Sequence, residues 1–293
     1  MRDRDGFSTG KRALRTSGRH ARALGLRSWA LSLIIAAALG LLVAVTTLIL
    51  PYLVSSPAAD PHFGALNQCL MGVVQGPRLG WAVAPDASRA ATFDARTVAL
   101  CGKRGPATVL STPGVTAITF DGEDRLWVAT SERLLREEAG QLEPVGDFAP
   151  VALAGHSAGV LAMDSQGQLL SISPQGAVLG QAKLPAAGAL SVGPGGTLAA
   201  VVVDGGVVAY EARTLTPLLA EAPCQVEGLW WLDAPDRVLL ACGPGQGGAL
   251  TLDLKTGRQT DAPRQVRTPA RRLPGLALYV QGCDGLPCTA PTP

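Results

Sequence analysis

Residues 114–145 read GVTAITFDGEDRLWVATSERLLREEAGQLEPV, in which short apolar runs alternate with turn residues. None of the runs continues as an apolar stripe with the 3.6-residue period of a helix, so the pattern favours strands. The turn Asp121–Asp124 separates the first two strands. The expected strands are Thr116–Phe120, Leu126–Thr130, Arg133–Arg136 and Leu142–Val145. These residues therefore predict a unit of four short strands.

Four further units of this kind flank residues 114–145. The first-hairpin turns of the five units start at residues 86, 121, 155, 193 and 233, a spacing of 34–40 residues. This spacing is close to that of β-propeller blades, whose repeats run about 40–50 residues. A four-stranded blade has two apolar faces that only neighbouring blades can cover, so the blades stack and close into a ring. We therefore predict an all-β fold, a β-propeller of about six four-stranded blades, with five as the next choice.

The end of the chain leaves the last blade short of a strand. Residues 263–293 follow the fifth unit and are too few for another full blade together with a cysteine-containing tail. The segment LNQCLMGVV at Leu66–Val74 precedes the first unit. We expect it to add a strand to the last blade and so fasten the ring.

The unit at residues 114–145 resembles one blade of the two-component-regulator and streptogramin-lyase-like propellers. In that family a strand, a D-G turn and an L-W-V-A-T strand follow in this order, as they do here. The resemblance covers this unit well and the other units loosely. It implies a fold more than a function, because propellers host binding, scaffolding and catalysis alike.

A long apolar run precedes the repeat. Residues 29–50 read WALSLIIAAALGLLVAVTTLIL without a charge, which is enough helix to cross a bilayer core of about 30 Å. Eight Lys and Arg residues precede this run, and the next 14 residues, PYLVSSPAADPHFG, have none, so the positive-inside rule predicts a cytoplasmic N-terminus. The predicted parts are a basic cytoplasmic tail (1–28), a transmembrane helix (29–50), a linker (51–65) and an extracytoplasmic β-propeller-like domain (66–293). A cleavable signal peptide is the alternative, but its apolar core is only about 7–15 residues long.

The charge balance limits the partners of the exported part. Beyond residue 28 the chain has 17 Lys and Arg against 21 Asp and Glu, a net charge of −4, which argues against nucleic acid as a partner. Arg outnumbers Lys 21 to 4, a bias associated with GC-rich bacterial genomes. The expected location is the bacterial cytoplasmic membrane, with a single pass and with the bulk of the chain in the periplasm or outside the cell.

The cysteines agree with export. All six follow the predicted membrane segment, and an even number there indicates disulfides, for which 15 pairings exist. A Gly and a Pro between Cys283 and Cys288 allow the chain to turn back, and Cys224 and Cys242 flank one predicted hairpin, which leaves Cys69 with Cys101. A metal site is disfavoured because no CxxC pair occurs and the three His residues are far apart. We expect no cofactor.

One motif resembles a catalytic signature. GHSAG at Gly155–Gly159 matches the G-x-S-x-G nucleophile elbow of α/β-hydrolases, with Ser157 as the nucleophile. That mechanism needs a histidine later in the chain, and none follows His156. We therefore predict a hairpin turn at GHSAG and no catalytic residue.

The acidic turn of the second unit is a candidate calcium site. Asp121, Glu123 and Asp124 lack the D-x-D-x-D-G order of a calcium loop. A solvated turn is the expected role, and no metal ligand is predicted.

The candidate binding surface consists of two tryptophans and four arginines. Trp230 and Trp231 point to opposite faces of a strand, so one belongs in the core and the other is expected at a binding surface. The basic cluster consists of Arg264, Arg267, Arg271 and Arg272. It is either a solvated loop or charged edge strand that discourages aggregation, or a site for an anionic partner, a lipid headgroup or a cell-wall polymer.

The predicted anchor, the repeat and the lack of a credible catalytic set favour a non-enzymatic protein-binding or assembly module of the cell envelope. Its expected partners are the cytoplasmic membrane and another envelope protein. The alternative is an exported lyase or hydrolase with acidic residues at the propeller mouth. A third possibility is a sensor, which would need a separate membrane partner because the tail of 28 residues holds no domain.

Overall fold

The computed structural model describes residue 37 and residues 60–290, with gaps at 75, 104, 220–223, 233, 244–247, 263–270, 273–278 and 284–285. The chain forms two compact units, Met1–Ser56 and Pro57–Pro293. Of the predicted tail and transmembrane helix, only Ala37 belongs to the described residues, where it is helical. Within the described ranges, none of the helices combines the length and the apolar character that a membrane crossing requires.

Six antiparallel sheets follow one another along the second unit, each made of strands that are consecutive in the chain. The first sheet consists of β1 (Gly80–Val83), β2 (Arg89–Phe93), β3 (Thr97–Gly102) and β4 (Thr108–Ser111). The second consists of β5 (Val115–Phe120), β6 (Leu126–Thr130), β7 (Leu134–Glu138) and β8 (Gln141–Gly146). The third consists of β9 (Ala152–His156), β10 (Gly159–Met163), β11 (Gln168–Ile172) and β12 (Val178–Lys183).

The remaining three sheets have the same meander topology. The fourth consists of β13 (Ala189–Val192), β14 (Leu198–Val203), β15 (Gly206–Glu211) and β16 (Pro217–Leu219). The fifth consists of β17 (Val226–Trp231), β18 (Arg237–Cys242), β19 (Ala249–Asp253) and β20 (Gln259–Asp261). The sixth has three described strands, β21 (Arg271–Arg272), β22 (Tyr279–Cys283) and β23 (Leu286–Ala290).

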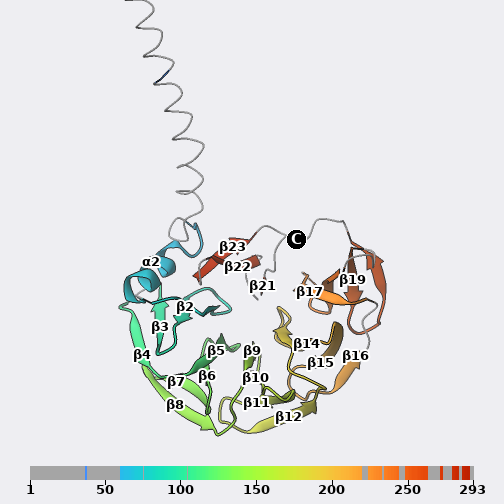
Figure 1. The fold of residues 1–293 in the computed structure, drawn as a ribbon, viewed down its shortest axis with the longest axis horizontal. Helices are drawn as coiled ribbons and strands as arrows, with labels where there is room; N and C mark the ends of the chain where they lie inside the picture. Colours follow the sequence, from blue (N-terminus) through green and yellow to red (C-terminus); the bar gives the residue numbers. More distant parts are fainter. Residues whose placement is uncertain are drawn as a thin grey trace, which may run out of the picture. The chain divides into compact units, whose positions relative to one another are not determined.

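These six sheets are arranged around a ring in chain order (Figure 1). The first strands β1, β5, β9 and β13 contact one another in succession, β17 contacts β21, and β1 contacts β23. A hydrogen bond of 2.9 Å from the indole N–H of Trp231 in β17 to the hydroxyl of Ser191 in β13 joins the fifth sheet to the fourth. The fold is a β-propeller, as the repeat predicts. The six sheets of the described residues agree in number with the predicted blades, with three strands described in the sixth.

Apolar residues from two adjacent sheets fill each of the first four seams. Between the second and third sheets, for example, Trp127 and Leu134 pack with Val160 and Ile172. The second and third blades each have a neighbouring blade on both faces. Every residue of their second strands, β6 and β10, is therefore buried. Small and branched residues suit these strands because neighbouring blades approach closely on both sides.

The segment expected to supply a strand is instead a helix. Helix α2 (Gly64–Val73) covers this segment and packs against β2, β3 and β23, between the first and last sheets (Figure 1). The expectation of a strand at Leu66–Val74 is therefore wrong. The helix buries Phe63, Leu66, Leu70 and Val74, which are at most 5% exposed and recur every three or four residues. This spacing is helical and is a signal in the sequence for the helix.

Helix α2 and Asp60, four residues before its start, still fasten the ring, by side-chain bonds rather than by strand pairing. The Asn67 amide donates to the carbonyl oxygen of Pro287 at 2.8 Å. The Asp60 carboxylate accepts the backbone N–H of Thr289 at 2.7 Å and its hydroxyl at 3.0 Å. Together with the disulfide from Cys69, these contacts join the first and last sheets. We call Asp60–Val74 the closing segment.

The three disulfides are those predicted. Cys69–Cys101 joins α2 to β3 across 32 residues, and Cys224–Cys242 joins the start of the fifth sheet to β18 across 18 residues. Cys283–Cys288 joins β22 to β23. The predicted pairing is therefore confirmed for all three pairs.

Candidate functional site

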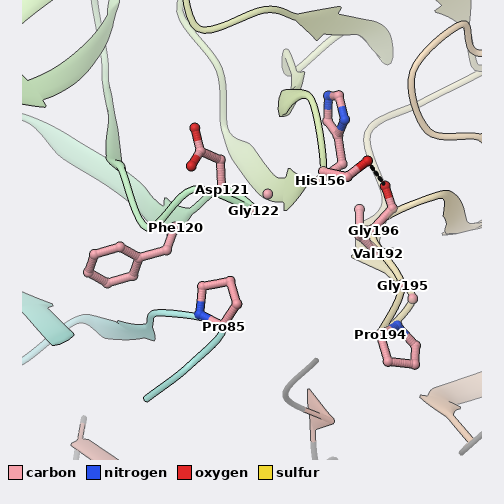
Figure 2. Close-up of a pocket in the computed structure, with 12 residues that line it drawn as sticks. Pro85, Phe120, Asp121, Gly122, His156, Val192, Pro194, Gly195 and Gly196 are labelled. Atoms are coloured by element: carbon pink, nitrogen blue, oxygen red, sulfur yellow. Dashed lines mark hydrogen bonds between the residues drawn. The ribbon is translucent and has the colours of Figure 1, made fainter. Parts of the chain in front are cut away.

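The first-hairpin turns of the first four sheets meet around a pocket of about 190 Å³ (Figure 2). Each turn follows the first strand of its sheet, so the repeat places all four at the same end of the blades. Glycine and proline dominate the lining. The lining residues are Pro85, Phe120, Asp121, Gly122, Gly155, His156, Ser157, Val192, Gly193, Pro194, Gly195 and Gly196.

Backbone hydrogen bonds connect three of these turns directly. The N–H of Gly122 donates to the carbonyl oxygen of His156 at 3.0 Å. The N–H and the hydroxyl of Ser157 both donate to the carbonyl oxygen of Gly196, each at 3.1 Å. The second, third and fourth blades are thus bonded in series at the pocket wall.

The two glycines of GHSAG have packing roles, Gly155 between neighbouring blades and Gly159 within its own blade. A Cβ atom on Gly155 would lie 1.7 Å from the carbonyl oxygen of Phe120 in the neighbouring blade. Gly159 has a φ of 145°, and a Cβ there would lie 2.0 Å from the carbonyl oxygen of Ile172. Only glycine fits either position without displacing backbone.

His156 lies behind the pocket wall. Its side chain is 1% exposed, and Figure 2 shows the imidazole pointing away from Pro85 and Pro194. Its Nδ1 accepts the backbone N–H of Ala158 at 3.2 Å, which places the proton on Nε2, 3.2 Å from the hydroxyl oxygen of Ser171. Burial lowers the pKa of His156 to about 4, with a further lowering from the positive charge of Arg213 that partly offsets the raising effect of Asp121. The ring is therefore neutral at pH 7.

This geometry agrees with the prediction of a turn at GHSAG. His156 bonds Ser171, whereas the Ser157 hydroxyl donates to a carbonyl oxygen. A nucleophilic serine must instead give its proton to a base. Ser157 has no such base among its described partners.

Asp121 is a structural carboxylate at the inner end of β5. It is fully buried, and Oδ1 accepts the N–H groups of Glu123 and Arg125 at 2.9 and 3.1 Å. Oδ2 accepts Nε of Arg125 at 2.8 Å and the indole N–H of Trp127 at 2.9 Å. Four donors thus occupy its lone pairs.

The side chains of the acidic turn Asp121–Asp124 do not converge as metal ligands. Glu123 is paired with Arg125 at 2.7 Å on the exposed side. Burial, with the negative charges of Asp86 and Asp121, raises the pKa of Asp124. Within the described part of the chain, no three His, Cys, Asp or Glu side chains are grouped so as to hold a metal ion.

The predicted binding surface is not assembled in the described residues. Trp230 and Trp231 are only 6% and 2% exposed, so the expectation that one of them is exposed is wrong. Trp231 packs in the seam between the fourth and fifth sheets, and Trp230 packs with Leu239 of its own sheet, so neither indole is left to solvent. Of the basic cluster, Arg264 and Arg267 lie outside the described residues, and Arg271 and Arg272 form β21.

The sequence predicts the turns of the pocket but assigns no role to Phe120, which lines it, or to Arg213, which lines a second pocket that shares Ser157 with it. The repeat itself contains a signal for both. Phe120 immediately precedes the first-hairpin turn of its sheet, and Arg213 lies in the turn between the last two strands of its sheet.

Comparisons with known proteins support the fold alone. No protein-family model matches the chain, and no curated protein is significantly similar to it in sequence. A chain in the crystal structure of the mitotic checkpoint complex is 12% identical, with a TM-score of 0.52 over 62% of this chain and 63% of that chain.

Two further solved structures are similar at lower TM-scores. Kuenenia stuttgartiensis hydrazine synthase is 14% identical, with a TM-score of 0.44 over 60% of this chain and 64% of that one. The WD40 domain of SCAP from fission yeast is 16% identical, with a TM-score of 0.49 over 67% and 57%. The matches span about three fifths of each of these structures' chains. The likeness at the higher TM-score supports a β-propeller repeat protein.

Proposed function

We propose that this protein is a non-enzymatic binding or assembly module, a β-propeller anchored in a bacterial cytoplasmic membrane that binds another protein of the cell envelope. The uncharged run at residues 29–50 supports the anchor, and the basic residues before it support a cytoplasmic N-terminus. Three disulfides support an oxidising compartment for the propeller. The resemblance of residues 114–145 to the streptogramin-lyase-like propellers stays a prediction about family and assigns no activity.

One observation carries the proposal of binding without catalysis. The pocket between the four turns has three side chains with catalytic potential, and each is engaged in holding the fold. Asp121 accepts four hydrogen bonds, His156 is buried and neutral, and Ser157 donates to Gly196. What the pocket presents is mostly backbone, glycine and proline, which suits contact with another polypeptide.

The alternative of an exported lyase or hydrolase requires several acidic groups at the propeller mouth. The one carboxylate that lines the pocket among the described residues is Asp121, whose oxygens are occupied. No specific observation therefore favours this alternative.

Photo-crosslinking in intact membranes tests the proposal. Gly195 is exposed, lines the pocket and has room for a side chain, since the nearest atoms to an added Cβ are at 3.7 Å. A photoreactive phenylalanine analogue at Gly195 is expected to give a discrete adduct with one protein, identified by mass spectrometry.

The matched control is the same analogue at Gln166, an exposed residue in the β10–β11 turn at the other end of the strands. This position is expected to give no such adduct. Absence of any protein adduct at Gly195, or the same adducts at both positions, would refute a binding role for this end of the propeller.

A further inference from the structure

The GHSAG turn joins three blades at the wall of the pocket. The carbonyl oxygen of His156 accepts the N–H of Gly122 from the second blade at 3.0 Å. Ser157 donates its N–H and its hydroxyl to Gly196 of the fourth blade. Both neighbours approach closely, since a Cβ atom on Gly122 would lie 2.8 Å from Cα of Ser157, and one on Gly196 would lie 2.7 Å from its nitrogen. A change in the shape of this turn therefore breaks its bonds to both neighbouring blades.

The closed turn requires the neutral form of His156. Its Nδ1 accepts the N–H of Ala158, and its Nε2 lies 3.2 Å from the hydroxyl oxygen of Ser171. A second proton would bind at Nδ1, where it would face the N–H of Ala158 and remove the acceptor of that bond. The side chain is 1% exposed, so water does not reach the ring to solvate its charge. The protonated ring therefore fits only when the turn opens.

Few charged groups surround this ring. The strands β5, β6, β10 and β13, which contact β9, contain no charged residue. Burial lowers the pKa of His156, whereas the negative charge of Asp121 at the end of β5 raises it. The positive charge of Arg213 in the β15–β16 turn lowers the pKa further, and a hydrogen bond with the backbone of Val160 raises it. Burial outweighs both raising effects, and the pKa is about 4.

This difference from an exposed histidine links the turn to pH. Because the pKa is about 4 in the closed turn and 6.5 in an exposed ring, the closed turn has its full stability above pH 6.5 and loses it as the pH falls toward 4. The ratio of open to closed turns, here called the opening constant, is therefore about 70-fold larger at pH 4.5 than at pH 7.5.

We propose that the GHSAG turn is an acid-sensitive switch, in which protonation of His156 opens the turn, separates the second, third and fourth blades at the pocket and releases the protein partner. The release step rests on the proposed function, whereas the opening of the turn rests on its own geometry. Among the described residues His156 is the one buried histidine, since His62 is exposed, so the other blades have no counterpart of the switch there.

Hydrogen exchange of the purified full-length protein, resolved to single amides by mass spectrometry, tests the opening. We expect the opening constants at Gly122, Ser157 and Ala158 to be about 0.01 at pH 7.5 and to rise about 70-fold at pH 4.5, after correction for intrinsic exchange rates. The amides of β18 should have opening constants at least about a hundredfold smaller at both pH values. Equal constants in the turn and in β18 would mean that acid unfolds the whole ring, which refutes a local switch. A turn constant below about 0.001 at pH 7.5 also refutes it, because acid would then open fewer than about a tenth of the molecules.

Two variants assign the effect to His156. The side-chain oxygen of His156→Asn keeps an acceptor close to the place of Nδ1 and does not titrate, so we expect the acid-induced rise to disappear. Arg213→Ala removes an exposed charge that opposes protonation, so the pKa of His156 should rise and the acid-induced rise in opening should be smaller than in the parent. The matched control Arg258→Ala removes an exposed arginine of the fifth sheet and should keep the full 70-fold rise. A full rise in both His156→Asn and Arg213→Ala would refute the role of His156.

The photoreactive analogue at Gly195 tests the release in intact membranes. We expect the adduct to be lost at pH 4.5, to return at pH 7.5, and to persist at both pH values in His156→Asn. An adduct that persists at pH 4.5 while the turn opens refutes the release step and leaves the binding role intact. Absence of the adduct at both pH values refutes the proposed function together with the release step, and hydrogen exchange still decides whether the turn opens.

Discussion

The hydroxyl of Ser157 lies 3.1 Å from the carbonyl oxygen of Gly196, one blade further along the ring. This bond, with the one from the Ser157 N–H to the same oxygen, ties the third blade to the fourth. The serine of a G-x-S-x-G sequence therefore joins blades here. Its two glycines lie where a side chain would collide with backbone, Gly155 with Phe120 of the second blade and Gly159 with Ile172 of its own blade.

Replacement of Gly155 should be among the most damaging changes in the chain. We expect Gly155→Ala to lower the free energy of unfolding by about 3 kcal/mol or more, because its Cβ would overlap the Phe120 carbonyl and force the two blades apart. Urea unfolding followed by tryptophan fluorescence measures this. Gly146→Ala, at a position with no atom near an added Cβ, is the matched control and should change stability little. Equal stability of the two variants would contradict the packing role.

His156 should make stability depend on pH. Its pKa is about 4 in the folded chain and 6.5 when unfolded, so between these values the unfolded chain binds the proton and the folded chain does not. Stability is thus full above pH 6.5 and falls by about 3 kcal/mol as the pH drops to 4. Urea midpoints at pH 7.5 and 4.5 measure the loss.

Two variants isolate this effect. His156→Gln should be less pH-dependent over that range, and His62→Ala, which removes an exposed histidine, should behave like the parent. Parallel pH profiles for the parent and His156→Gln would show that another group is responsible.

The disulfide of the closing segment should stabilise the fold most. Loop-closure entropy predicts about 3.7 kcal/mol for the 32-residue separation of Cys69 and Cys101, against about 2 kcal/mol for the 5-residue separation of Cys283 and Cys288. Double serine variants of each pair, compared by urea unfolding, test this order. A larger loss for the Cys283–Cys288 pair would mean that the closing segment contributes little.

Asp60 should hold the two ends of the ring together. Burial raises the pKa of its carboxyl, but hydrogen bonds from Thr289, His62 and Phe63 outweigh this and lower the pKa below its ordinary value of 3.8. The contribution is therefore present above pH 3.8 and is lost as the pH falls through the lower folded value. We expect Asp60→Asn to cost about 1–3 kcal/mol and to speed hydrogen exchange in β23. Unchanged exchange in β23 would argue against a closing role, and Asp147→Asn, an exposed aspartate, is the control.

Asp121 should be essential to its blade. Asp121→Ala leaves the buried indole N–H of Trp127 and the Nε of Arg125 without their acceptor, and we expect a loss of about 3–5 kcal/mol. Glu123→Ala, which removes a largely exposed acid from the same turn, should cost less than about 1 kcal/mol. Similar losses for both would show that the turn, and not the buried carboxylate, is what matters.

The sequence predicts the local structure of the chain. The turn spacing of 34–40 residues predicts the units and their strands, since each unit is a meander whose pairing depends on near neighbours. The three disulfide pairings can be predicted for the same reason, because the paired cysteines are only 32, 18 and 5 residues apart in the chain. The sequence also predicts the first-hairpin turns, which supply most of the pocket lining.

The closed ring decides which side chains are buried and which residues they contact. Alternation along a strand predicts one exposed tryptophan at Trp230–Trp231, but both are buried. Trp231 packs in the seam between the fourth and fifth sheets, and Trp230 packs with Leu239 of its own sheet. The closing segment forms a helix whose apolar residues at helical spacing pack with residues of both the first and the last sheets, a contact that the sequence alone does not predict. The sequence thus predicts the repeating unit, because the contacts within a unit are local. Which side chains meet across the seams follows only from the folded ring, because those contacts join residues of different blades.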